Sequence, residues 1–142
     1  AHGEYAAIIP DGVHVSDGAM LAALRAIPRL FAVTDATAAA GMPDGEYPLG
    51  SHRVTKRDAS VFLDEDTLAG SALTMDRGLE NLLALGLELD DACRRISTYP
   101  ADFLGIGDRG RIAPGSWADL VLLEDGQRIS EIIVEGEAIP AT

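Results

Sequence analysis

Side chains that could carry out acid–base or metal chemistry follow two short apolar runs near the start of the chain. Residues 5–10 (YAAIIP) lead to Asp11 and His14, and residues 30–33 (LFAV) lead to Asp35. In parallel α/β proteins, reactive side chains gather at the carboxyl ends of the strands. The sequence therefore predicts that His14 and Asp35 lie near each other at the same end of a sheet.

Each of these residues also has a structural interpretation. Asp35 could act as a general acid/base or a metal ligand, or it could cap a turn before Thr37. His14 could belong to the same site or be an exposed loop histidine, and the isolated His2 and His52 are interpreted as structural or exposed. No His-x-His, Cys-x-x-Cys or His-Glu-x-x-His motif occurs. The sequence therefore does not predict a complete three- or four-ligand zinc site.

A strand–helix–strand unit is expected to position these residues. The two apolar runs, 5–10 and 30–33, have the length of buried strands. Between them, Ser16 or Asp17 can cap a helix and Pro28 ends it. The apolar residues of one helix face are Met20, Leu21, Leu24 and Ile27. This order favours a parallel βαβ unit.

The middle of the chain predicts inserted strands followed by helices. Residues 46–63 alternate with a period near two, which indicates an inserted hairpin or side sheet. Residues 68–71 (LAGS) predict a tight turn, in which Ser71 caps a helix that stops at Gly86. Such a turn could offer backbone amides to an acyl oxygen or a phosphate. Two further helices are expected, at residues 89–98 and 101–104.

The last part of the chain has a different residue pattern. After Gly105, glycines and proline punctuate a turn-rich stretch, and residues 118–123 and 129–134 are expected to be strands. Glu135-Gly136 then predicts a hairpin turn. The fold class is therefore α/β, with an α/β body followed by a small all-β tail.

Composition limits the partners. The chain has 142 residues, enough for one ordinary domain, and a formal net charge of −12. That charge argues against nucleic acids and anionic membrane surfaces. If the substrate is anionic, a few placed Arg or Lys groups must overcome an unfavourable global field. Cys93 is the only cysteine, so no intrachain disulfide is possible, which fits a cytoplasmic setting.

Four segments occur in an order that resembles one family. Residues 33–47 (VTDATAAAGMPDGEY), 11–15 (DGVHV) and 68–75 (LAGSALTM) resemble N-acetylglucosamine-6-phosphate deacetylases of the amidohydrolase superfamily. Residues 110–121 (GRIAPGSWADLV) resemble the turn and strand by which many amidohydrolases leave the barrel for a small β-domain. The first three segments are specific together, whereas the last is general to the superfamily.

The resemblance implies a fold. It suggests the C-terminal part of a distorted (β/α)8 barrel, of the TIM type, with a side β-sandwich. Residues 1–109 would form the barrel portion, with an inserted hairpin at about 46–63. Residues 110–142 would form the tail that belongs to the sandwich domain.

The resemblance also implies a reaction and its site residues. The enzyme would be a divalent-metal-dependent hydrolase, with zinc or a similar ion, that converts N-acetylglucosamine 6-phosphate to glucosamine 6-phosphate and acetate. Asp35 would take a proton from metal-bound water and give it to the leaving amine, and it is a possible metal ligand. His14 would contact the sugar, and Leu68, Ala69 and Gly70 would line the sugar pocket.

The resemblance further implies that part of the enzyme is missing. The family's other metal ligands and its phosphate-binding residues would precede Ala1. The chain is therefore expected to be a piece of a longer, homodimeric protein and to be inactive alone. A partial barrel exposes sheet edges and apolar faces, so it is expected to need self-association or the missing part.

Two other hypotheses remain open. The chain could belong to another amidohydrolase, such as a dihydroorotase-like cyclic-amide hydrolase or another N-acyl hydrolase. It could also be a non-catalytic oligomerisation module with an enzyme-like fold.

Overall fold

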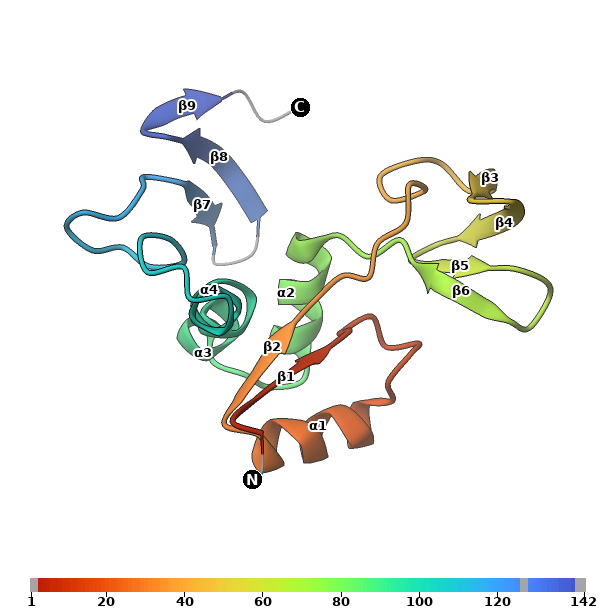
Figure 1. Cartoon of the computed structure of the whole chain (residues 1–142), viewed down its shortest axis with the longest axis horizontal. Helices are drawn as coiled ribbons and strands as arrows, with labels where there is room; N and C mark the ends of the chain where they lie inside the picture. Colours follow the sequence, from red (N-terminus) through yellow and green to blue (C-terminus); the bar gives the residue numbers. More distant parts are fainter. Residues whose placement is uncertain (1–2, 126–127, 140–142) are drawn as a thin grey trace.

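The computed structural model describes residues 3–125 and 128–139. Within these ranges the chain forms three separate sheets, with helices between the first and the third (Figure 1). The α/β class expected from the sequence is confirmed. The expectations for residues 1–2, 126–127 and 140–142, including His2, lie outside the described residues.

The first sheet contains the strand–helix–strand unit. Strands β1 (Tyr5–Ile8) and β2 (Arg29–Ala32) pair in parallel, with Ile8 opposite Ala32, and α1 (Asp17–Ala26) connects them. This confirms the predicted parallel unit, whereas the expectation that both strands are buried is wrong for β1, which has no buried residue. Ser16 occupies the cap position of α1, although its side chain makes no capping hydrogen bond.

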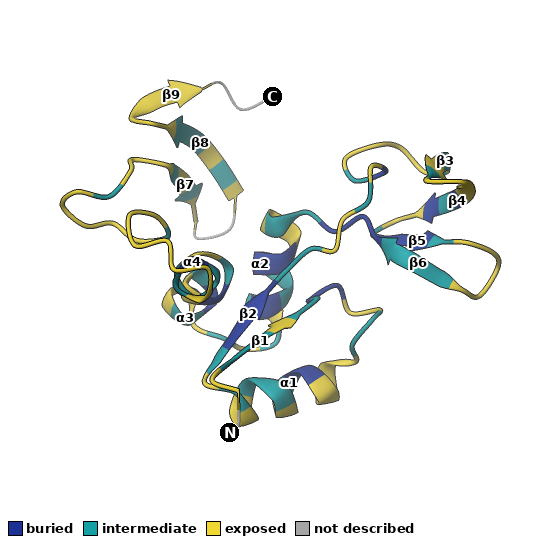
Figure 2. Ribbon diagram, in the orientation of Figure 1, coloured by how far each residue is buried: buried dark blue, intermediate teal, exposed yellow. Residues whose placement is uncertain are grey.

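Strand β2 is the most buried strand of this sheet because helices cover it. Its last three residues are buried, which explains the unbroken apolar run (Figure 2). Buried Arg95 fastens the covering helices, since its Nη1 donates to the Leu30 carbonyl at 2.9 Å and its Nε donates to Asp91 at 3.0 Å. A core cluster formed by Ala32, Leu79, Leu82 and Ala92 lies beneath the strand.

The helices differ from the prediction at one junction. Helix α2 (Met75–Ala84) is followed by α3 (Leu89–Cys93), a π-helical turn η1 (Arg94–Thr98) and α4 (Tyr99–Phe103). The sequence predicted two separate helices, whereas residues 89–103 are continuously helical. Pro100 lies in the first turn of α4, where its missing N–H is tolerated, and the π turn precedes it.

The inserted hairpin is larger than predicted. Strands β3 (Gly45–Leu49), β4 (His52–Arg57), β5 (Ser60–Phe62) and β6 (Leu68–Ser71) form a four-stranded antiparallel sheet. A second core cluster, formed by Ala39, Val54, Val61 and Ala72, lies against it. The expected tight turn at 68–71 is therefore wrong, because these residues form the strand β6.

Ser71 consequently does not cap a helix. Its hydroxyl accepts a hydrogen bond from the Leu73 amide at 2.8 Å, and α2 begins only after Thr74. On the open side of β6, Ser71 makes a parallel bridge with Ala36. The backbone of Ser71 is thus occupied by neighbouring chain segments, so it is not available to an anion as the sequence suggested.

The third sheet is the β tail. Strands β7 (Leu120–Glu124), β8 (Arg128–Val134) and β9 (Glu137–Ile139) are antiparallel. Glu135 and Gly136 have φ of 53° and 87°, as a tight hairpin turn between β8 and β9 requires. The strands and the turn expected here are confirmed. Assignment of the tail to a separate domain stays a prediction.

Helix length bears on membrane insertion. In the part of the chain that the structure describes, none of the helices has both the length and the apolar character needed to cross a membrane.

Candidate active site at the carboxyl ends of two parallel strands

The two expected reactive residues both follow the carboxyl end of the β1–β2 sheet. The strands run in parallel, and the Val33 amide donates to the Ile8 carbonyl at 2.9 Å. His14 follows β1 and Asp35 follows β2, so both leave the carboxyl end of the same strand pair. Among the described residues, no hydrogen bond or ion pair joins His14 directly to Asp35. Their shared action on one substrate therefore stays a prediction.

His14 is held by a buried carboxylate. Its Nδ1 lies 2.6 Å from Oδ2 of Asp11, whose side chain is 0% exposed. Oδ1 of Asp11 accepts the backbone amides of Val13 and His14 at 3.0 and 2.9 Å. The His14 side chain remains 21% exposed. His14 is thus an oriented histidine, and its interpretation as a merely exposed loop residue is wrong.

The pKa of Asp11 reflects this environment. Burial raises the pKa of its carboxyl, but hydrogen bonds from the His14 ring and from the Val13 and His14 amides lower it. The net effect holds the pKa of Asp11 below its usual 3.8. Asp11 is therefore a carboxylate at neutral pH, able to accept a hydrogen bond from a protonated nitrogen. The place of Asp11 at the strand end was predictable from the sequence, whereas its contact with His14, three residues on, was not predicted.

Asp35 lies exposed in a backbone conformation that few residues adopt. Its φ is 50°, in the left-handed region that a non-glycine residue enters at an energetic cost. Two backbone hydrogen bonds hold the segment: the Ser71 amide donates to the Asp35 carbonyl at 3.1 Å, and the Thr37 amide donates to the Ser71 carbonyl at 2.8 Å. Because the Thr37 amide is used in this way, the expectation that Asp35 caps a turn before Thr37 is wrong.

The Asp35 carboxylate itself accepts no hydrogen bond and forms no ion pair with any residue that the structure describes. An exposed carboxylate on a strained backbone has no structural contact to account for it. The turn residues Asp58, Asp125 and Glu135 have a similar φ, so the backbone alone does not distinguish Asp35. Its place after the carboxyl end of β2, with an unpartnered carboxylate, makes it a candidate functional group.

Strand β6 supports Asp35 through a close approach of two backbones. Gly70 has φ 129°, and a Cβ added there would lie 2.7 Å from Cγ2 of Thr37. The three residues expected to line a sugar pocket, Leu68, Ala69 and Gly70, are half-buried in β6. The structure therefore places them beside the Asp35 segment, whereas their contact with a sugar stays a prediction.

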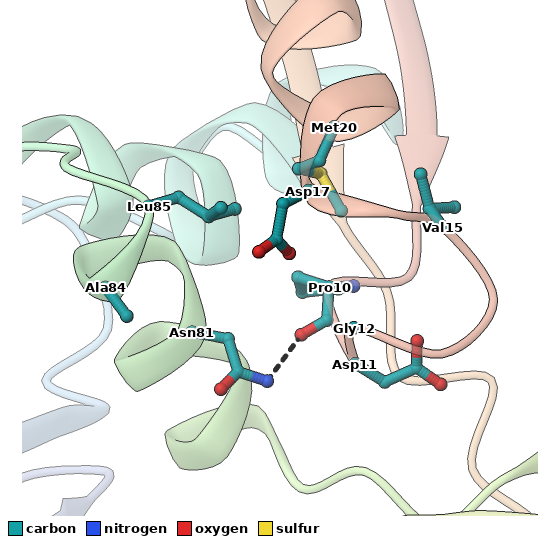
Figure 3. A pocket seen from close by; sticks show the side chains of 9 residues that line it. All are labelled: Pro10, Asp11, Gly12, Val15, Asp17, Met20, Asn81, Ala84 and Leu85. Carbon is teal, nitrogen blue, oxygen red and sulfur yellow. Dashed lines mark hydrogen bonds between the residues drawn. The ribbon is translucent and has the colours of Figure 1, made fainter.

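The turn that carries Asp11 is anchored by a distant helix. Nδ2 of Asn81, in α2, donates to the carbonyl of buried Pro10 at 2.8 Å (Figure 3). The surrounding cavity is lined by residues of α1, α2 and this turn: Pro10, Asp11, Gly12, Val15, Asp17, Met20, Asn81, Ala84 and Leu85. Figure 3 shows the carboxylate of Asp17 pointing into the space between Leu85 and Pro10.

The other side chains that could bind a metal ion do not form a cluster among the described residues. Within residues 3–125 and 128–139, no group of three or more His, Cys, Asp or Glu side chains could hold a metal ion. His52 is exposed at the start of β4, as expected. Cys93 is half-buried, and burial raises the pKa of its thiol.

The chain matches one protein family and is similar to several curated proteins. A model described as "Amidohydrolase family" matches residues 3–139. A putative N-acetylgalactosamine-6-phosphate deacetylase from Escherichia coli K12 is 37% identical over 133 residues, which cover 92% of this chain and 80% of that protein. The N-acetylglucosamine-6-phosphate deacetylase of Vibrio furnissii is 35% identical over 93% of this chain, but the match covers only 34% of that enzyme.

The chain is also similar to solved structures of deacetylases. The N-acetylglucosamine-6-phosphate deacetylase of Thermotoga maritima has a TM-score of 0.85 at 35% identity, covering 93% of this chain and 37% of that one. The Mycobacterium smegmatis enzyme, solved as an aspartate-to-alanine mutant with N-acetyl-D-glucosamine-6-phosphate, has a TM-score of 0.84 at 34% identity, covering 93% of this chain and 36% of that one. The chain therefore spans about a third of the length of most of these proteins, and it belongs to the amidohydrolase family.

Proposed function

We propose that this chain is the C-terminal part of a deacetylase that hydrolyses the N-acetyl group of N-acetylglucosamine 6-phosphate. The products would be glucosamine 6-phosphate and acetate. The observation that carries the proposal is the exposed, unpartnered carboxylate of Asp35 at the end of β2, beside the end of β1 that carries His14. Similarity to deacetylases named for this substrate supports it.

Asp35 would move the proton that amide hydrolysis requires. A water must lose a proton to attack the acetyl carbon, and the amine nitrogen must gain one before it leaves. One carboxylate can do both in turn, provided that no other group already occupies it. The carboxylate of Asp35 accepts no hydrogen bond from the described residues, so it is available for this exchange.

His14 and β6 would bind the sugar. The ring of His14 is fixed through Nδ1, which leaves Nε2 to face a ligand. Leu68, Ala69 and Gly70 would line the pocket next to Asp35, because β6 is paired with residues 35–37 through Ser71. In this arrangement β6 would both line the sugar pocket and hold the segment that carries Asp35.

A divalent metal is generally used by amidohydrolases, and when bound it would polarise the acetyl carbonyl. The described residues do not fit this group alone, since they include no set of three candidate ligands. Asp35 could supply one ligand, and we propose that residues beyond this chain supply the others. The roles given to Asp35 and His14 here do not depend on where the ion lies.

The larger assembly is also part of the proposal. The chain would complete a (β/α)8 barrel with a side β-sandwich, in a cytoplasmic, homodimeric enzyme. TM-scores of 0.84 and 0.85 to two deacetylase structures support this architecture. The net charge of −12 argues against nucleic acid as a partner. The chain alone would be inactive.

N-acetylgalactosamine 6-phosphate is a second candidate substrate. Two relatives, each 37% identical to this chain, are named for that sugar. The two sugars differ only in the orientation of one hydroxyl group, so the reaction and the roles of Asp35 and His14 would be the same.

A chimera tests the proposal. This chain would replace the segment that it matches in the Vibrio furnissii enzyme, and the purified chimera would be assayed on both N-acetyl sugar phosphates, unphosphorylated N-acetylglucosamine and dihydroorotate. Deacetylation of a sugar phosphate in preference to the other substrates supports the proposal. A folded chimera that hydrolyses only the cyclic amide would favour the dihydroorotase-like alternative. A folded but inactive chimera would favour the non-catalytic module.

A further inference from the structure

We propose that Asp11 is a positioning residue that fixes the neutral imidazole of His14 as its Nδ1–H tautomer and leaves Nε2 as a hydrogen-bond acceptor toward the substrate. The part of this inference that concerns substrate recognition by Nε2 rests on the proposed function. The assignment of the tautomer is independent of that function, because it follows from the geometry of residues 11–14.

The carboxylate of Asp11 can only accept hydrogen bonds where it lies. Its side chain is 0% exposed, Oδ1 accepts the Val13 and His14 amides, and Oδ2 lies beside Nδ1 of His14. A buried carboxylate that lost these donors would be left with an unpaired charge, which is strongly unfavourable. The Nδ1 atom, 2.6 Å from Oδ2, must therefore carry a proton.

The pKa of Asp11 is consistent with this assignment. The carboxyl remains ionised at neutral pH because hydrogen bonds from the His14 ring and from two amides outweigh the effect of burial. Oδ2 therefore has no proton of its own to donate to Nδ1. A reversed hydrogen bond, from a protonated Asp11 to a bare Nδ1, is disfavoured near pH 7, because it requires the carboxyl to hold a proton against a lowered pKa.

Tertiary contacts fix the turn that carries this pair. Pro10 is buried, and its carbonyl accepts a hydrogen bond from Asn81 of α2, 71 residues away in the sequence. Gly12 has φ 73°, which a turn of this kind places on glycine without strain. The orientation of His14 is thus tied to α2 as well as to its own loop.

The tautomer determines what His14 can recognise. A free imidazole ring can place its neutral proton on either nitrogen, and the partner of one nitrogen decides the state of the other. With Nδ1–H bound to Asp11, neutral His14 presents a lone pair at Nε2. It would accept a hydrogen bond from a sugar hydroxyl or from the acetamide N–H, and it would not donate one to the acetyl oxygen.

NMR of the chain itself tests the tautomer. The chain has three histidines, so long-range proton–nitrogen correlations of the rings can be resolved, and a His14→Gln variant identifies the signals of His14. Above the pH at which the ring is protonated, we expect a protonated Nδ1 and a bare Nε2. Exposed His52 serves as the internal control and should show the opposite preference. A His14 ring that carries its neutral proton on Nε2 would overturn the inference without any variant.

A conservative variant adds a quantitative check. In Asp11→Asn the charge-assisted hydrogen bond is lost, so the ratio of the Nδ1–H to the Nε2–H form of His14 should fall about tenfold. The signals of His52 should not change. An unchanged ratio in a folded Asp11→Asn chain would also contradict the inference.

The part that concerns substrate recognition is tested separately in the chimera described above. Asp11→Asn should lower kcat/KM when His14 is present and have no further effect in a His14→Gln background. An equal loss in both backgrounds would show that Asp11 has only a structural role. If the chimera is folded but inactive, the proposed function fails while the NMR result on the tautomer still stands.

Discussion

At the scale of one residue, the carboxylate of Asp35 is the candidate functional group. Its backbone is held at φ 50° by hydrogen bonds to Ser71, while its side chain has no partner among the described residues. Structural carboxylates in this chain behave differently, since Asp11 and Asp44 each accept hydrogen bonds from a basic side chain and from backbone amides. A side chain that the fold positions but does not use is available for chemistry.

Removal of the Asp35 charge should therefore leave stability unchanged. Asparagine tolerates the left-handed conformation, so Asp35→Asn keeps the backbone and removes only the charge. We expect the free energy of unfolding of the chain to change by less than about 0.5 kcal/mol, as for a surface substitution that breaks no contact. Urea denaturation measures this. A loss of several times that size would mean that the carboxylate has a structural partner.

Removal of the Asp11 charge, in contrast, should lower the stability of the chain. The pKa of Asp11 lies below 3.8 in the folded chain, so between that lowered value and about 4 the unfolded chain binds more protons than the folded one. The stabilisation is therefore fully present above about pH 4 and is lost as the pH falls through the folded-state pKa.

Asp11→Asn should destabilise the chain by about 1–3 kcal/mol at neutral pH, because buried charge-assisted hydrogen bonds are removed. The difference between wild type and variant should shrink as the pH falls below about 4. Denaturant titrations at a series of pH values measure both effects. A difference that stays constant down to strongly acidic pH would contradict the assignment of a lowered pKa to Asp11.

At the scale of elements, β6 connects the inserted sheet to the candidate site. Its outer edge pairs with residues 35–37, and its glycine allows the close approach. The sequence did not reveal this strand, because residues 69–71 are small, residues 68–71 lack a clear period, and the strand's support at residues 35–37 is distant in the chain. The apolar runs of β1 and β2, in contrast, were predictable from their continuous hydrophobic signal, which burial accounts for in β2 but not in β1, where no residue is buried.

Gly70→Ala tests this connection. The added methyl group would lie 2.7 Å from Cγ2 of Thr37 and would also meet an unfavourable φ of 129°. We expect a loss of about 1–3 kcal/mol in stability and altered amide shifts at residues 35–37. Gly86→Ala is the matched control, since Gly86 also has a positive φ but has open space around it.

The double variant Gly70→Ala/Thr37→Ser separates the two causes. Serine lacks the methyl group that would clash but keeps the hydroxyl that accepts the Ala39 amide. Part of the lost stability should therefore return. If Gly70→Ala is no more harmful than Gly86→Ala, then β6 does not constrain the segment that carries Asp35.

At the scale of the whole molecule, the described chain leaves much apolar surface uncovered. Phe103, Leu104 and Ile112 are 56%, 67% and 90% exposed. Among the described residues of β7, β8 and β9, none is buried (Figure 2). The β1–β2 sheet has only two strands in the part of the chain that is described, so each strand has one neighbour.

The class of fold and the strand ends were predictable from the sequence, whereas the contacts that support those ends were not. Local patterns predicted β1, β2 and the tail hairpin, since each depends on burial or on turn residues within a few positions. The contacts that orient the site depend on partners far along the chain, such as Asn81 for Pro10 and Ser71 for Asp35. Neither pairing leaves a periodic signal in the sequence.

The exposed surface predicts that the isolated chain associates. Open strand edges and large apolar patches favour contact with another copy. Sedimentation velocity over a range of concentrations should show a reversible increase in mass. A well-folded monomer that persists at both high dilution and high concentration would contradict this expectation.

The most direct test of the central claim is the rate of acetate release by the chimera with and without the Asp35 carboxylate. If Asp35 transfers the proton, Asp35→Asn should lower kcat by about 100-fold or more, while the chimera keeps its stability. A folded Asp35→Asn chimera that releases acetate from the sugar phosphate at the unmodified rate would show that the proton passes through another group.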